Sequence, residues 1–309
     1  MSTSKFYVFV IILHVFFLGF SQSDSPSSFI DLNVYSGNIA RHNDDIAHLI
    51  KGHPNGLILG WNKRVSGAKS WHSQYNYPEF GASFVAQNFN TQTLGSSYGI
   101  YGHYNFYFFK RHLMLRIAQG ISYATNPYNK FDNPKNIAFG SKLLSGTYLM
   151  LNYVQHRVLG PIGVQAGLTL LHLSNANIKA PNTSINSITL NLGLTAALTT
   201  KPKLKVAESL QPEVDKRIRY GFLFRTGINQ SDVVGSPQFP FYIFSAYAEK
   251  QFSRKSIMTL GTEYFNSKFL KEYIFYQSVA YPDSNVGSNK DYKRVGIYVG
   301  HELLFGRFS

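Results

Sequence analysis

The chain has 309 residues and an excess of basic side chains, with 30 Lys and Arg against 16 Asp and Glu and a formal net charge of +14. Aromatic residues account for 16% of the chain and charged residues for only 15%, well below the roughly 25% of an ordinary soluble domain. Cysteine is absent, which excludes disulfides, thiolate metal sites, a thiol nucleophile and a lipid-modified N-terminal cysteine.

The charge by itself selects no function. Nucleic acid is not expected as a partner, because no basic recognition helix or known recognition motif accompanies the basic residues. Scattered lysines in loops explain most of the excess, and an anionic lipid surface explains the rest as well as nucleic acid would. We therefore expect a membrane, and no nucleic acid, among the partners.

The first residues predict a secretory signal peptide that is cleaved. Residues 1–5 carry one positive charge, residues 6–20 form an apolar run, and small polar residues follow from Ser21 onward. The run is shorter than the roughly 20 residues that a membrane-spanning helix needs, and no stretch of that length occurs later. We therefore expect residues 1–21 to be removed on export.

After an irregular N-terminal region over residues 22–78, alternation of apolar and polar residues predicts antiparallel strands. The strand candidates are residues 79–89, 97–108, 113–123, 145–153, 162–174, 187–199, 218–227, 241–251, 256–265 and 294–305, and residues 56–63 and 273–281 could add two more. This pattern is typical of an all-β fold, an antiparallel transmembrane β-barrel with an even number of strands, about 8–12. We assign residues 79–309 to the barrel.

The two faces of each strand differ in character. In residues 162–174 and 187–199 the even positions are mostly Leu, Ile, Val and Ala, whereas the odd positions are mostly Gly, Gln, Ser, Thr and Asn. We expect the apolar face to meet lipid and the small polar face to fill a narrow lumen. A soluble lipid-binding barrel would reverse these faces, and alternation alone does not separate the two cases. Four charged residues share the lumen-facing parity, and we expect them to form a network inside the barrel: Arg219, Arg225, Glu249 and Glu263.

The connections between strands fall into short and long ones. Short turns are expected near residues 110–112, 156–161 and 252–255, and long loops over residues 124–144, 175–186 and 230–240. In outer-membrane barrels the short turns face the periplasm and the long loops face outward, which places residues 175–186 outside. The long connection over residues 200–216 is an exception to this scheme. The chain ends without the terminal aromatic residue usual in such barrels, which leaves a C-terminal truncation open.

One strand end carries residues that could perform catalysis. His172 and Ser174 are two positions apart on a strand and so point to the same face, where an imidazole can take the proton of a hydroxyl. By parity this is the lipid-facing side, and Asn186 on the neighbouring strand shares it, so that its side chain can hold the imidazole. Asn175 could donate to a developing oxyanion, with Asn182 as a second candidate for the oxyanion or the substrate. An isolated His-x-Ser pair also occurs often by chance.

The surrounding residues resemble the active-site segment of the lipid A 3-O-deacylases of the PagL type, also called acyloxyacyl hydrolases. The resemblance rests on His172-x-Ser174-Asn175-Ala176, Lys179, Pro181-Asn182 and Ile185, and further similar segments are Gly60-Trp61-Asn62-Lys63, Trp71, Tyr77-Pro78-Glu79-Phe80-Gly81 and Ala138-Phe139-Gly140-Ser141. In that family a His is the base, a Ser the nucleophile and a Glu orients the His, roles that the resemblance places on His172, Ser174 and Asn186. Asn186 departs from the family Glu, and Ser184 stands where the family usually has Gly.

The resemblance implies an outer-membrane serine esterase that hydrolyses an acyl ester of lipid A in lipopolysaccharide, without a cofactor. Outer-membrane phospholipase A is the first alternative, because it has Asn at the position of Asn186, and it would add calcium and a dimer. A non-catalytic barrel, a pore or a structural protein, is the second alternative. Near the N-terminus, Asp44 and Asp45 lie close to His42 and His48, but their pattern lacks a persuasive metal-ligand geometry.

Overall fold

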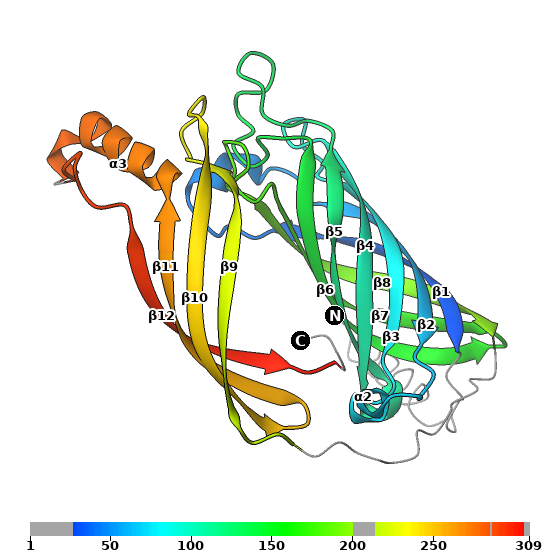
Figure 1. The fold of residues 1–309 in the computed structure, drawn as a ribbon. Helices are drawn as coiled ribbons and strands as arrows, with labels where there is room; N and C mark the ends of the chain where they lie inside the picture. Colours follow the sequence, from blue (N-terminus) through cyan, green and yellow to red (C-terminus); the bar gives the residue numbers. More distant parts are fainter. Residues whose placement is uncertain (1–26, 200–213, 285, 306–309) are drawn as a thin grey trace, which may run out of the picture.

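Eight antiparallel strands form a closed barrel in the computed structural model, which describes residues 27–199, 214–284 and 286–305 (Figure 1). In chain order they are β1 (Ser28–Ile39), β2 (Asn55–Arg64), β3 (Glu79–Asn88), β4 (Ser96–Phe108), β5 (Leu113–Ala124), β6 (Leu143–Leu159), β7 (Ile162–Ser174) and β8 (Ile185–Thr199). Each strand pairs with its neighbour in sequence, and β1 pairs with β8 to close the cylinder. The expected antiparallel barrel is thus confirmed.

The remaining strands form a separate four-stranded sheet in the order β12-β11-β10-β9 (Figure 1). These are β9 (Ile218–Gln230), β10 (Gln238–Ser253), β11 (Ser256–Ser267) and β12 (Arg294–Leu303), with α3 (Lys268–Ala280) and η3 (Pro282–Ser284) between the last two. Short helices η1 (Asp45–Leu49), α2 (Ser70–Gln74) and η2 (Phe109–Arg111) lie in barrel connections. None of the helices in the described residues combines the length and apolar character needed to cross a membrane.

The structure corrects the expectation of an irregular region over residues 22–78, because β1 and β2 lie there and β1 closes the barrel. In β1 the inward side chains include Asp31 and Asn33, both buried. Polar and charged residues at inward positions make such a strand look like a loop in the sequence. The suggestion of a strand over residues 56–63 is confirmed by β2, whereas residues 273–281 belong mostly to helix α3. A short apolar run does not distinguish a strand from a helix.

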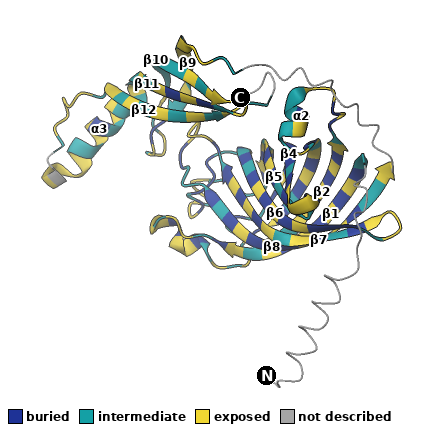
Figure 2. Ribbon diagram, turned by 90° about the horizontal axis from the view of Figure 1, so that it is seen from below, coloured by how far each residue is buried: buried dark blue, intermediate teal, exposed yellow. Residues whose placement is uncertain are grey.

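The assignment of all strands over residues 79–309 to one barrel is also corrected. Because β8 pairs with β1, the cylinder is complete at eight strands, and the last four strands are left to pair among themselves. Figure 2 shows the barrel from below, with the four-stranded sheet beside it. The proposed signal peptide, residues 1–21, and most of the connection over residues 200–216 lie outside the described residues.

Polar side chains fill the barrel, and apolar side chains cover its outside. Arg116 and Asp31 form an ion pair of 2.7 Å between Nη2 and Oδ2, and both side chains are fully buried. Asn62 donates to Asp31 and accepts from Arg116, so that three strands are tied together through the lumen. On the outside, Leu190 is 69% exposed, and Figure 2 shows buried and exposed residues alternating along the strands. The facing that we predicted for residues 162–174 and 187–199 is confirmed.

The expected charged network inside the barrel lies elsewhere. Arg219 pairs with Glu249 at 2.9 Å, and Arg225 pairs with Glu263. Both pairs cross strands of the four-stranded sheet and share one of its faces, because β9 to β11 do not belong to the barrel. The four side chains therefore share one face, as predicted, but this face belongs to the four-stranded sheet and not to the barrel lumen. Inside the barrel, the ion pairs are Arg116 with Asp31 and Arg111 with Glu79.

Candidate active site

The hairpin of β7 and β8 carries the candidate catalytic residues at the end of the barrel where the β1–β2, β3–β4 and β5–β6 connections also lie. His172 is directly opposite Asn186 in the antiparallel register. Leu171 and Leu173 on either side of His172 point inward and are buried, which turns the imidazole outward. Ser174 is the last residue of β7 and shares the face of His172, as predicted from its spacing.

His172 and Asn186 are in contact. The Nδ1 atom of His172 lies 2.7 Å from Oδ1 of Asn186. An amide oxygen can only accept a hydrogen bond, so Nδ1 carries the hydrogen and Nε2 is left with a lone pair. The arrangement leaves His172 in the tautomer that a general base requires, with its ring held through Nδ1 by the side chain of Asn186.

Ser174 makes hydrogen bonds with the loop that follows it. Asn182 Nδ2 donates to Oγ of Ser174 at 2.9 Å, and the backbone N–H of Ala176 donates to the same oxygen at 3.1 Å. Within the described part of the chain, no hydrogen bond joins Ser174 to His172. Such catalytic hydrogen bonds are often long without substrate and shorten when it binds. The hydroxyl and the imidazole share one face of the strand.

The two expected oxyanion donors differ in their placement. Asn182 places its amide nitrogen beside Ser174 and also donates to Asn177 Oδ1 at 2.7 Å. Asn175 is only 2% exposed, and its Nδ2 donates to the backbone oxygen of Lys179 at 2.6 Å. The side chain of Asn175 therefore braces the loop, and only its backbone N–H, which donates to Asn182 Oδ1 at 2.9 Å, touches the site. The sequence alone does not distinguish these two roles.

The loop between β7 and β8 is held against the connection between β5 and β6. Thr183 donates through both its backbone N–H and its hydroxyl to the oxygen of Ile137, each at 3.1 Å. A Cβ atom at Gly140 would lie only 2.4 Å from the backbone oxygen of Lys179, so that only glycine permits this close approach. Gly140 is part of one of the segments on which the family resemblance rested.

One departure from the family pattern lies at a position with an unusual backbone conformation. Ser184, where the family usually has Gly, has a φ of +58°. This left-handed conformation is one that glycine adopts readily, whereas a residue with a Cβ adopts it at a cost of roughly 1–2 kcal/mol. Ser184 therefore stands at a position whose backbone conformation favours glycine.

The four-stranded sheet also supports the site loop, which the sequence did not suggest. Oε1 of Gln230 accepts from the backbone N–H of Ala180 at 2.7 Å, and the backbone N–H of Gln230 donates to the backbone oxygen of Asn177 at 2.8 Å. Gln238 Nε2 donates to the oxygen of Ile178 at 2.6 Å. The turn between β9 and β10 thus reaches back to the loop that carries Asn182. No local pattern in the sequence indicates a contact over this separation.

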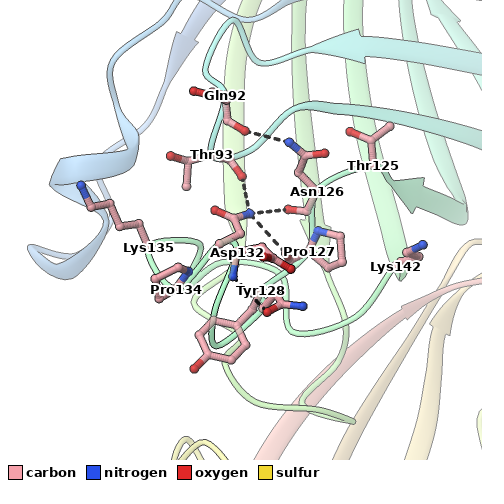
Figure 3. A pocket seen from close by; sticks show the side chains of 12 residues that line it. Gln92, Thr93, Thr125, Asn126, Pro127, Tyr128, Asp132, Pro134, Lys135 and Lys142 are labelled. Carbon is pink, nitrogen blue, oxygen red and sulfur yellow. Dashed lines mark hydrogen bonds between the residues drawn. The ribbon is translucent and has the colours of Figure 1, made fainter.

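A cavity of about 670 Å³ lies between the loops at the same end of the barrel (Figure 3). It is bounded by the connections β3–β4 and β5–β6 and is lined mainly by polar residues, among them Asn126, Asp132 and Lys135. None of the five candidate site residues lines it, so the candidate site and this cavity are separate features. No group of three or more His, Cys, Asp or Glu in the described residues is arranged to hold a metal ion.

The comparisons with known proteins follow the same division as the fold. Residues 55–195 match the family described as "Lipid A 3-O-deacylase (PagL)", and residues 218–309 match "Acyloxyacyl hydrolase, C-terminal domain". The chain belongs to the PagL-type deacylase family. Membership implies a hydrolase that acts on an ester bond. The first match contains His172, Ser174 and Asn186, and the second begins at β9, where the separate sheet begins. No curated protein matches the chain.

Proposed function

We propose that this PagL-type protein is an outer-membrane serine esterase that hydrolyses an acyl ester of lipid A. The observation that carries the proposal is the contact between His172 and Asn186 beside Ser174, inside the part of the chain that matches the deacylase family. An imidazole with a fixed tautomer next to a hydroxyl is the arrangement that serine hydrolysis needs.

In the proposed reaction, the Ser174 oxygen attacks the ester carbonyl while Nε2 of His172 takes the hydroxyl proton. The tetrahedral intermediate collapses, the ester C–O bond breaks, and His172 returns the proton to the leaving alcohol of lipid A. A water molecule then attacks the acyl-enzyme with His172 again as base, which releases the fatty acid and regenerates Ser174. Asn186 holds the imidazole and stabilises the imidazolium that forms in each step.

Asn182 is the side chain best placed to donate to the oxyanion. Its Nδ2 lies 2.9 Å from Oγ of Ser174, the attacking oxygen. A small shift of this amide would let it donate to the carbonyl oxygen of the bound ester instead. A preorganised amide donor of this kind contributes about 10²–10³-fold to the rate in serine hydrolases. Asn175 acts in this scheme through the loop that it braces.

The membrane setting is argued from the outward faces of β7 and β8. Their outward-facing residues are apolar and exposed, as in barrels that meet lipid. Leu170, two positions before His172, lies on the same outward face. Ser174 and His172 therefore lie at the end of an apolar belt, where the ester of a membrane lipid can reach them. Orientation follows from the long connections, which we place on the outside of the outer membrane with the hairpin loop.

Asn186 favours one alternative, the outer-membrane phospholipase A reaction, because that enzyme class has Asn in this role. The same three residues would then cleave a phospholipid ester. The chemistry is unchanged, and only the bound lipid differs.

The test is mass spectrometry of lipid A and phospholipids from outer membranes that contain the wild-type protein, Ser174→Ala or the control Ser73→Ala. Ser73 is an exposed serine of α2, at the opposite end of the barrel. We expect lipid A to lose one acyl chain with wild type and Ser73→Ala, and to remain intact with Ser174→Ala. Lysophospholipid in place of deacylated lipid A would assign the phospholipase reaction, and no change in either lipid would overturn both.

A further inference from the structure

An asparagine in the place of the family glutamate raises a requirement that a carboxylate does not have. Both oxygens of a carboxylate accept hydrogen bonds, so either can hold the imidazole. An amide has one accepting end and one donating end, and a rotation of its plane by half a turn exchanges them. Asn186 supports His172 only while its oxygen faces Nδ1, and something must therefore hold its NH2 group on the opposite side.

His42 occupies the position that meets this requirement. It lies in the connection between β1 and β2, and its Nδ1 is 3.3 Å from Nδ2 of Asn186. The backbone fixes this approach, because the backbone N–H of Ala40 donates to the backbone oxygen of Asn186 at 2.8 Å. The ring is anchored a second time through Nε2, which lies 2.9 Å from the backbone oxygen of Thr183.

The directions of these hydrogen bonds follow from the one group whose role is fixed. The oxygen of Thr183 can only accept, so Nε2 of His42 carries the hydrogen, and in the neutral ring Nδ1 then has a free lone pair. That lone pair accepts from Nδ2 of Asn186, which turns Oδ1 toward His172. Nδ1 of His172 donates to Oδ1 of Asn186, and Nε2 of His172 is left as the base.

We propose that His42 is a positioning residue that fixes the orientation of the Asn186 amide and, through it, the tautomer of His172. The inference rests on the proposed esterase function for its catalytic meaning. His42 lies before residue 55, outside the part of the chain that matches the deacylase family, so the family match assigns it no role. The same ring nitrogen is 3.3 Å from the oxygen of Ala40, a contact that in this tautomer has no hydrogen to share.

A double-mutant comparison separates this role from simple support of the loop. Four full-length proteins are purified in detergent: wild type, His42→Ala, Asn186→Asp and the double variant. An aspartate at position 186 has two accepting oxygens and needs no fixed orientation. We expect His42→Ala to lower kcat about tenfold in the wild-type background, the change that corresponds to one lost hydrogen bond, with KM little affected.

In the Asn186→Asp background we expect the same substitution of His42 to change kcat by less than about threefold. His42→Asn should restore most of the lost rate, because its Oδ1 can accept where Nδ1 of the histidine does. An equal loss in both backgrounds, or no rescue by asparagine, would mean that His42 only ties the loops together and would overturn the proposal.

A second readout does not depend on catalysis. Long-range 15N NMR of the histidine-labelled protein in micelles reports which nitrogen of His172 carries the hydrogen, with His172→Gln to assign the signal. We expect the Nδ1–H form in wild type and a mixture of both tautomers in His42→Ala. An unchanged tautomer would overturn the positioning role even if the enzyme is active. The expected tautomer change in a protein that hydrolyses no ester would retain the positioning role and overturn the proposed function.

Discussion

The barrel and the four-stranded sheet are both built from antiparallel strands, but the barrel buries its charged side chains and the sheet leaves them partly exposed. In the barrel, closure between β1 and β8 encloses the ion pair of Arg116 and Asp31 completely. In the sheet, the side chains of Arg225 and Glu263 remain 45% and 18% exposed, and β9 and β12 have no outer neighbour among the described strands. We therefore expect closure of the barrel to set how much each ion pair contributes to the free energy of unfolding. The hairpin that carries the candidate site belongs to the closed barrel.

The largest effect is expected from breaking the enclosed ion pair. Asp31→Asn leaves the guanidinium of Arg116 buried without a counter-charge, and we expect the free energy of unfolding to fall by about 3–5 kcal/mol. Urea unfolding of the protein in detergent, followed by tryptophan fluorescence, measures this loss. A loss below about 1 kcal/mol would mean that the lumen is hydrated and that closure does not isolate the pair.

A smaller effect is expected where the barrel loops meet the site. Gly140→Ala places a methyl group only 2.4 Å from the backbone oxygen of Lys179, and we expect a loss of about 1–3 kcal/mol in the free energy of unfolding together with reduced esterase activity. Gly102→Ala is the matched control, because a Cβ at that barrel position meets nothing within 4 Å. Equal behaviour of the two variants would show that the loop does not depend on this close approach.

The link between the two regions should have a moderate and local effect. Gln230→Ala removes the acceptor of the Ala180 N–H, which costs about 1–3 kcal/mol if that buried group finds no other partner. We expect faster hydrogen exchange at residues 178–182 and a severalfold lower kcat, with no change at β2 to β4. Unchanged exchange in this loop would argue that the sheet contacts the site without stabilising it.

The smallest effect is expected from the ion pair of the open sheet. Arg225→Gln removes a partly exposed partner of Glu263, and we expect a change of about 0–1 kcal/mol in the free energy of unfolding. The same urea experiment as for Asp31→Asn gives the direct comparison. A loss as large as in the barrel would show that this face of the sheet is enclosed in the folded protein.

The sequence predicted those features that depend on neighbouring strands. The alternation in β7 and β8 set which residues face outward, and the short separation along the hairpin brought Asn186 to His172, as the register confirms. Features that depend on distant pairing were missed. β1 pairs with β8, which follows it in the sequence only after six other strands, and its inward Asp31 made the strand resemble a loop. His42 reaches Asn186 over 144 residues, which no local pattern can indicate.

The proposed esterase function depends on activation of the Ser174 hydroxyl by His172. Its most direct test is covalent labelling with a fluorophosphonate, followed by peptide mass spectrometry of wild type, His172→Ala and Ser73→Ala. We expect one adduct on Ser174 in wild type and in Ser73→Ala, and at least about 100-fold slower labelling without the imidazole. A label on another residue, or equal labelling of Ser174 without His172, would contradict the account.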